Sequence, residues 1–317
     1  MGDTFLSIYL IGENMRHPIL LCTALFFAVF FSSLSSAGDK PSVFVSILPQ
    51  KYFVEQIAGD LVNIQVMVKP GASPATYEPK VSQMKKLAVS ELYFAVGVPF
   101  EQAWLERIAG VNSQMKIVKT DVGIKKLAME KHLHDDEEDD SHEEHAGDDH
   151  ENEQGEGLDP HIWLSPQLVK QQATVICASL KELLPEQTTL FETNLTRFKM
   201  KIDVLDTELQ EIFVGKESLR FMVFHPSWGY FAQNYKLRQV PIEIEGKGPK
   251  SSQLRDLILF ARAEGIKVIF AQPQFSTKSA NLVAREIGGQ VVTVDPLAED
   301  WLANMKVVAE KFRDAIQ

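Results

Sequence analysis

The sequence predicts an α/β protein with two lobes, each built on a parallel sheet, and one long helix between them. Short apolar segments alternate with helical segments over residues 43–119, and the same alternation restarts at residue 221 and continues to the C-terminus. Alternation of this kind is typical of parallel sheets whose strands are connected by helices. A single long amphipathic segment, residues 186–214, separates the two runs.

The first lobe is predicted to span residues 38–185. Its strands are the short apolar runs, rich in Val, Ile and Phe, at 43–48, 62–68, 92–96 and 116–119. Its helices are the segments with helical apolar spacing at 50–58, 81–89, 101–109 and 166–184. A loop over 69–79 follows the second strand.

The long helix is the most regular element, and we assign it to residues 186–215. Its apolar residues recur at spacings of three and four, which gives one stripe along the helix: Phe191, Leu195, Phe198, Ile202, Leu205, Leu209 and Ile212. A coiled-coil dimer is the alternative reading of this stripe. The flanking α/β segments favour packing against the chain's own lobes, so we expect a monomer.

The second lobe is predicted to span residues 216–317. Strands are expected at 221–224, 240–244, 268–271 and 291–294, and helices at 228–234, 252–264, 278–287 and 301–315. Ligands of such sheets bind outside the carboxyl ends of the strands and between lobes. The candidate binding residues are therefore those that follow strands.

The first 37 residues have the pattern of an export signal peptide. A short basic start at 15–17 precedes an apolar region of fourteen residues, 18–31, and a Ser-Ser-Ala cleavage site at 35–37. A membrane span needs roughly 20 apolar residues, so an uncleaved anchor is the less favoured alternative. Residues 1–14 contain no Lys or Arg, which makes Met15 an alternative start. These features predict a periplasmic protein.

The two cysteines are Cys22, inside the apolar segment, and Cys177. Cleavage removes Cys22, so we expect no intrachain disulfide in the mature protein. No cysteine lies directly after the cleavage site, where Gly38 stands, so no lipid anchor is expected either. Cys177 has the position of a small buried apolar residue in a helix.

The negative charge of the chain is concentrated in residues 130–158, which we interpret as a disordered loop without apolar periodicity. The remainder is close to neutral, and nothing in it resembles a basic nucleic-acid surface. The loop is either a solvated linker or a low-affinity metal antenna, because imidazoles that bind zinc are interleaved with carboxylates that attract cations. Its histidines are His132, His134, His142, His145 and His150.

Three residues at strand ends or loop starts are candidate metal ligands. His161 precedes a helix, His225 directly follows the strand at 221–224, and Asp295 directly follows the strand at 291–294. Two imidazoles and one carboxylate suit Zn²⁺ or another borderline divalent cation, with Mn²⁺ and Ni²⁺ as alternatives. Because the three come from both lobes, we expect them to meet between the lobes.

Two other classes of protein remain open on these residues. A metal-dependent enzyme also uses two histidines and one carboxylate, with an acid or base such as Glu78 or Glu245 beside the metal. An extracellular metal-binding adhesin is the other alternative. The sequence has no His-Glu-x-x-His, no phosphate-binding glycine loop and no Gly-x-Ser-x-Gly, so we expect that the protein is not an enzyme.

Four short motifs, in order along the chain, carry a family resemblance. They are Pro-Gly-Ala-Ser-Pro at 70–74 with Tyr77, Asp-Pro-His-Ile-Trp-Leu-Ser-Pro at 159–166, Phe-His at 224–225 with Gly-Tyr-Phe at 229–231, and Asp-Pro-Leu at 295–297. Together they resemble the zinc/manganese class of solute-binding proteins of metal ABC transporters. The histidine-containing acidic loop is similar to that of the zinc-type members.

The resemblance implies two α/β lobes joined by a rigid helix, with the metal in the cleft between them. It also implies that the protein delivers the metal to a membrane permease. The family usually has a histidine directly after the Gly-x-x-Pro turn, where this chain has Ala75. The carry-over is therefore limited to His161, His225 and Asp295, and the fourth position is left to water, Glu78 or a loop histidine.

Overall fold

The computed structural model describes residues 2, 39–130, 157–243 and 248–315. Apart from residue 2, the predicted signal peptide lies outside these ranges, as do Glu245 and the five histidines of the acidic segment. The described residues from Pro41 onward belong to one compact unit. In the part of the chain that the structure describes, no helix is long and apolar enough to cross a membrane.

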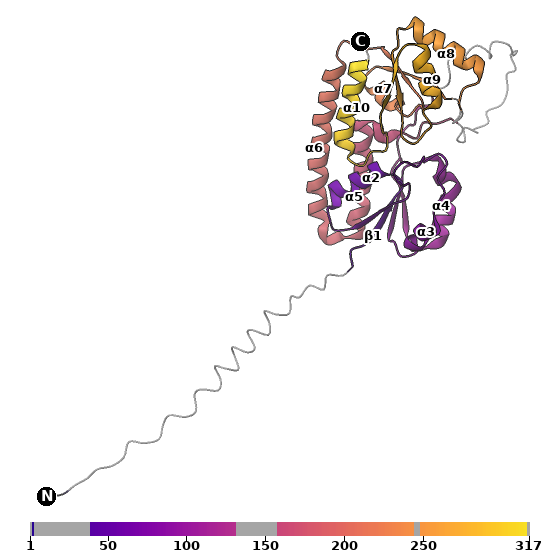
Figure 1. The fold of residues 1–317 in the computed structure, drawn as a ribbon. Helices are drawn as coiled ribbons and strands as arrows, with labels where there is room; N and C mark the ends of the chain where they lie inside the picture. Colours follow the sequence, from indigo (N-terminus) through magenta and orange to yellow (C-terminus); the bar gives the residue numbers. More distant parts are fainter. Residues whose placement is uncertain (1, 3–38, 131–156, 244–247, 316–317) are drawn as a thin grey trace, which may run out of the picture. The chain divides into compact units, whose positions relative to one another are not determined.

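The N-terminal lobe is a parallel four-stranded sheet of β1 (Ser42–Val45), β2 (Asn63–Val66), β3 (Leu92–Ala95) and β4 (Lys116–Lys119), in the order β2-β1-β3-β4. Its helices are α2 (Leu48–Ala58), α3 (Val81–Leu87), α4 (Pro99–Val111) and α5 (Pro166–Leu183). In Figure 1, α3 and α4 lie on one side of the sheet and α2 and α5 on the other.

The C-terminal lobe repeats this plan. Its parallel sheet consists of β5 (Arg220–Val223), β6 (Arg238–Pro241), β7 (Val268–Ala271) and β8 (Gln290–Thr293), in the order β6-β5-β7-β8. Its helices are α7 (Gly229–Asn234), α8 (Ser251–Ala263), α9 (Lys278–Glu286) and α10 (Trp301–Ala315). The two-lobed parallel α/β fold predicted from the sequence is confirmed.

The long helix α6 (Thr188–Phe213) connects the two lobes and packs against α2 and α5 of the first and α10 of the second (Figure 1). Five residues of its predicted stripe are at most 1% exposed: Phe191, Phe198, Ile202, Leu205 and Leu209. The stripe is therefore covered by the chain's own helices, and the coiled-coil reading does not apply to it.

Aromatic side chains join helices of the two lobes. The Phe198 ring on α6 lies 6.0 Å from Tyr52 and 5.9 Å from Phe53, both on α2. Phe53 in turn meets Trp301, the first residue of α10, edge-on at 5.4 Å. Since all of these rings belong to one apolar cluster that runs from β1 to α10, separating the lobes would expose a shared core.

The element boundaries differ from the predicted ones in a few places, and the helix starts among them have a clear cause. Helices α2 and α4 begin at Leu48 and Pro99, two residues earlier than predicted, because a proline occupies the first turn of each, where its missing N–H costs nothing. The long helix begins two residues later than predicted, at Thr188, since a separate 3₁₀ turn occupies Pro185–Gln187. Strand β6, the second along the chain in the C-terminal lobe, ends at Pro241 instead of residue 244.

Candidate metal centre

His161 lies just before the short 3₁₀ helix Ile162–Leu164 and is 8% exposed. Asp159 fixes it: the Oδ1 atom of Asp159 accepts a hydrogen bond from the His161 backbone N–H at 2.8 Å and lies 2.7 Å from Nδ1 of the ring. A carboxylate is only an acceptor, so Nδ1 carries the proton and the Nε2 lone pair is free. The arrangement therefore presents Nε2 of His161 as a metal donor.

Asp159 is held from the other lobe by the start of α7. The Tyr230 hydroxyl donates to the Asp159 carbonyl at 2.9 Å and accepts from the Leu127 backbone N–H at 3.1 Å. A Cβ at Gly229 would lie 2.7 Å from Oδ2 of Asp159, so a larger residue would displace the carboxylate. This contact gives the Gly-Tyr pair of the third motif a structural reason.

His225 follows the end of β5, the position predicted from the sequence. Gln272, directly after β7, accepts from the His225 backbone N–H at 3.2 Å and donates to its carbonyl at 2.7 Å. The ring Nδ1 lies 2.5 Å from Oε1 of Glu243, and Phe275 stacks on the ring with centroids 4.7 Å apart. Backbone, carboxylate and aromatic contacts thus fix the ring in one orientation.

Glu243 reaches His225 because β6 runs parallel to β5 at its edge. Val223 is level with Pro241 in this pair, and Glu243 donates its backbone N–H to the Phe224 carbonyl at 3.0 Å. The Glu243 residue is 5% exposed. A buried carboxylate that accepts from Nδ1 leaves Nε2 of His225 as the free donor.

The two free nitrogens face each other. Nε2 of His161 and Nε2 of His225 lie 3.4 Å apart, with the ring planes at 72°. A tetrahedral zinc ion bound at about 2.0–2.1 Å by two imidazoles would hold their nitrogens about 3.3–3.4 Å apart. The pair therefore already has the spacing of a zinc-bound pair.

Burial favours the metal-binding form of His161. It lowers the pKa of the imidazole below its ordinary value, and the neighbouring carboxylate of Asp159 opposes this shift without cancelling it. A neutral imidazole is the form that binds a metal ion. His161 is thus unprotonated at neutral pH even without a bound cation.

A cavity of ≈ 60 Å³ contains the histidine pair. Its walls come from both lobes and are mostly apolar, which keeps competing water away from a bound ion. They are Ser73, Pro74, Ala75, Val98, Pro99, Met129, Pro160, His161, Trp163, His225, Gln274, Phe275, Pro296 and Leu297. Ala75 lies in this wall, at the place where the family resemblance implies a ligand, and offers no donor atom.

Asp295 follows β8 as predicted, but its contacts differ from those of the histidines. Its Oδ1 atom accepts from Nε2 of Gln274 at 2.7 Å and from the Leu297 backbone N–H at 2.9 Å. It lines a neighbouring cavity of ≈ 240 Å³, which shares Gln274 and Leu297 with the histidine cavity. The structure therefore brings Asp295 to the edge of the site and the two histidines to its centre.

Glu78, the suggested fourth ligand, is exposed and lines neither cavity. Within residues 39–130, 157–243 and 248–315, no three His, Cys, Asp or Glu side chains are grouped to hold a metal ion. The complete ligand set stays a prediction.

Sequence reasoning did not identify Glu243 or Gln274 as residues of the site, and it did not assign a role to Asp159. Two signals were available. Asp159 lies two residues before His161, within reach of its ring, and Glu243 follows the strand that precedes α8, so its side chain belongs to the same sheet edge as His225. Gln274 carried no signal, because an amide at a loop start is unremarkable.

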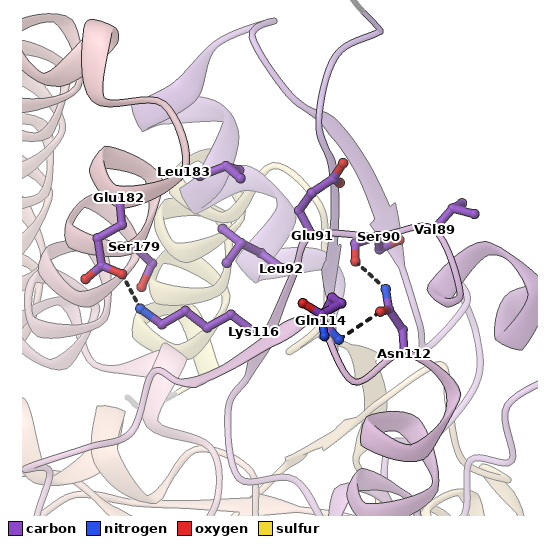
Figure 2. A pocket seen from close by; sticks show the side chains of 10 residues that line it. All are labelled: Val89, Ser90, Glu91, Leu92, Asn112, Gln114, Lys116, Ser179, Glu182 and Leu183. Atoms are coloured by element: carbon purple, nitrogen blue, oxygen red, sulfur yellow. Dashed lines mark hydrogen bonds and ion pairs between the residues drawn. The ribbon is translucent and has the colours of Figure 1, made fainter.

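A larger cavity, ≈ 490 Å³, lies at the other end of the N-terminal sheet, where β3 and β4 begin (Figure 2). It contains no histidine or cysteine, and the Lys116 ammonium in it pairs with Glu182. Asn112 donates to the Ser90 carbonyl at 2.9 Å. The charged groups of this pair and the Asn112 amide thus have partners within the protein, so the histidine pair is the better candidate site.

Two parallel-sheet lobes and a connecting helix, with paired histidines in a cavity lined from both lobes, are the architecture of the two-lobed solute-binding class. The chain belongs to the ZnuA family, zinc-uptake complex component A, periplasmic, whose family model matches residues 43–315. Membership of a transport family favours a binding protein over the metal-dependent enzyme and adhesin alternatives.

Individual relatives agree with this assignment. The zinc-binding protein AdcA of Streptococcus pyogenes serotype M3 is 26% identical over 292 residues, which cover 89% of this chain and 56% of AdcA. The high-affinity zinc uptake system protein ZnuA of Yersinia pestis is 28% identical over 288 residues, 88% of each chain. A crystal structure of ZnuA has 42% sequence identity and a TM-score of 0.78, and covers 88% of this chain and 100% of that one. The chain thus spans just over half the length of AdcA and most of ZnuA.

Proposed function

We propose that this protein captures zinc in the periplasm and delivers it to the membrane permease of an ABC transporter. The observation that carries the proposal is the 3.4 Å separation of the two Nε2 atoms, each freed by a carboxylate on the opposite ring nitrogen. Membership of the zinc-uptake family supports zinc as the cation. Zinc here is cargo, held and then released.

His161 and His225 bind the ion directly in this proposal, and Asp295 belongs to the same site from the edge. The two imidazoles come from opposite sides of the cavity, so the bound ion connects the lobes. The apolar walls exclude water, which strengthens the attraction between the cation and the buried carboxylates behind the rings. Water completes the coordination, since Glu78 is exposed and away from the cavity.

The remaining parts of the chain have roles that agree with this capture function. Residues 1–37 direct export, and mature protein begins near Gly38. The acidic segment 130–158 collects cations near the site, because Met129, directly before it, donates a backbone hydrogen bond to Gly157 near its other end and also lines the histidine cavity. We infer a monomeric binding protein, as the long helix stripe is covered within the chain.

Competitive zinc titration of single variants tests the proposal. Alanine at His161 or His225 is expected to weaken zinc binding by at least about 100-fold, because each removes one of two nitrogen donors. The matched control is His142→Ala in the acidic segment, which should leave the tightest site unchanged. A His161→Ala, His225→Ala double variant that binds zinc as tightly as the parent would refute the site and the function built on it.

A further inference from the structure

We propose that Gln274 supplies a third metal donor through its Oε1 atom, and that Asp295 acts on the metal through Gln274. This inference rests on the proposed zinc-binding function and deepens it. It assigns a ligand role to a residue that neither the motif pattern nor the set of ionisable side chains points to.

The position of Gln274 fits a donor. It lies three residues after β7, between β5 and β8 in the sheet, so its neighbours at that edge are His225 and Asp295. It lines the histidine cavity and the adjacent cavity of Asp295. Gln274 therefore borders both the cavity of the histidine pair and that of Asp295.

The orientation of the Gln274 amide is fixed by its partner. The atom that faces Asp295, 2.7 Å from Oδ1, must be the nitrogen, because a carboxylate can only accept. The opposite atom, Oε1, is buried and has no hydrogen-bond partner among the described residues. A buried carbonyl without a partner is costly, so a cation beside it would offset the cost.

The same construction occurs three times around the cavity. Asp159 accepts from the outer N–H of His161, Glu243 from that of His225, and Asp295 from the amide of Gln274. In each case a carboxylate fixes the inward group and makes its free donor atom more basic. In two of these three cases the inward group is an imidazole, and both imidazoles are proposed ligands. In the third case the inward group is the Gln274 amide, whose oxygen is the additional donor.

Other wall residues are poorer donors for zinc. The Ser73 hydroxyl already accepts from the Ala75 backbone N–H at 3.2 Å, and the Trp163 indole donates to the Pro296 carbonyl at 2.7 Å. The Met129 thioether is a soft ligand that suits Cu(I) better than Zn²⁺. Two nitrogens and the Gln274 oxygen then leave one tetrahedral position for water, through which the ion can be exchanged.

Variants at Gln274 and Asp295 separate this arrangement from direct binding by Asp295. Gln274→Met keeps the side-chain length without the amide, and Gln274→Ala removes it altogether. Both are expected to weaken zinc binding roughly 10–100-fold. Asp295→Ala should weaken binding in the parent but change it less than about twofold once Gln274 is Met, because its effect passes through the amide. Gln114→Ala, in the cavity of Figure 2, is the matched glutamine control and should leave zinc affinity unchanged.

Cobalt(II) in place of zinc gives a readout that a merely structural role would not move. Loss of the Gln274 oxygen should change the position and intensity of the cobalt visible bands, while the melting temperature of the metal-free variant stays near that of the parent. If Gln274→Met and Gln274→Ala keep zinc affinity and the cobalt spectrum, the proposal is overturned. If Asp295→Ala still causes a large loss in the Gln274→Met background, the proposal is also overturned, and Asp295 is then the direct ligand.

The failure of this inference is distinct from failure of the proposed function. Tight zinc binding that survives the double histidine substitution refutes the function. Binding that is lost with either histidine but indifferent to Gln274 refutes only the third donor.

Discussion

Glu243 is expected to set the zinc affinity of His225 without touching the ion. Its Oε1 atom lies 2.5 Å from Nδ1, while its Oε2 atom is buried with no hydrogen-bond partner among the described residues. Replacing Glu243 by Gln keeps an acceptor for the imidazole N–H and removes the charge. Replacing it by Leu removes both. The two variants separate the electrostatic effect of the carboxylate from its hydrogen bond.

The magnitude can be worked from the geometry. A zinc ion about 2.0–2.1 Å beyond Nε2 would lie about 6 Å from the carboxylate oxygen across the ring. At an effective dielectric constant of about 20, a charge of +2 and a charge of −1 at that distance attract by about 5 kcal/mol before desolvation is subtracted. Measured outer-shell substitutions at metal sites change affinity roughly 10–100-fold, or about 1.4–2.7 kcal/mol. We expect the lower value for Glu243→Gln and the higher one for Glu243→Leu.

The metal-free protein should respond in the opposite direction. Glu243→Gln keeps an acceptor for the His225 N–H and removes a buried carboxylate whose Oε2 lacks a partner among the described residues, so in the metal-free protein this substitution should be neutral or stabilising. Competitive zinc titration gives the affinity, and denaturant unfolding of the metal-free protein gives the stability. Asp206→Asn is the matched control: Asp206 is a buried carboxylate on α6 that accepts from Gln167, Gln210 and Tyr235 rather than from a histidine. It should lower stability and leave affinity unchanged.

Two results would contradict this reasoning about Glu243. One is zinc affinity within twofold of the parent for Glu243→Leu, which would mean that the carboxylate does not act through the ring. The other is a parallel loss of affinity and metal-free stability for Glu243→Gln, which would indicate a structural role alone.

Three further predictions concern proton competition, the acidic segment and the lobe contacts. Burial lowers the pKa of His161 below its ordinary value of about 6.5, so the His161 contribution to zinc binding should be retained at neutral pH. That contribution should be lost as the pH falls through the lowered pKa, which titrations at stepped pH will show. Deleting residues 131–156 and joining the ends by a short turn should keep the melting temperature and the tightest zinc site, because an antiparallel bridge between Ala128 and Leu158 already closes the base of the segment. The number of zinc ions bound per protein should fall, which equilibrium dialysis can count. Tyr235→Phe removes a hydroxyl that donates to buried Asp206 at 2.8 Å, and should lower the free energy of unfolding by about 1–2 kcal/mol in urea without changing zinc affinity.

The fold could be predicted because its signals are local. Each strand is a short apolar run and each helix has its own spacing, and the stripe of α6 repeats regularly enough to identify one buried face. The helix starts at Leu48 and Pro99 are harder to predict because proline is common in loops as well, although the first turn of a helix accepts it.

The positions of His161, His225 and Asp295 could also be predicted, because strand ends and loop starts are visible in a sequence. Their partners could not be. Glu243 lies eighteen residues after His225, and reaches it only because β6 is the neighbour of β5 and Val223 is level with Pro241. The sequence suggested Glu245, two positions further on, for an acid or base role, since strand order and register were unknown. A shift of two residues would have exchanged these carboxylates.

Asp295 shows the limit of counting ligand types. A carboxylate at a strand end in a cleft can bind a cation directly, or it can hold the side chain that does. The choice depends on the residue that the neighbouring strand places beside it, and here that residue is Gln274, whose amide occupies Oδ1 of Asp295. With Asp295 hydrogen-bonded to the Gln274 amide, the inner shell of a bound zinc ion would consist of neutral donors. Three carboxylates, those of Asp159, Glu243 and Asp295, would lie one side chain further from the ion. Such a site attracts the cation over the width of the cavity but binds it through neutral atoms, which suits the capture and release that we propose.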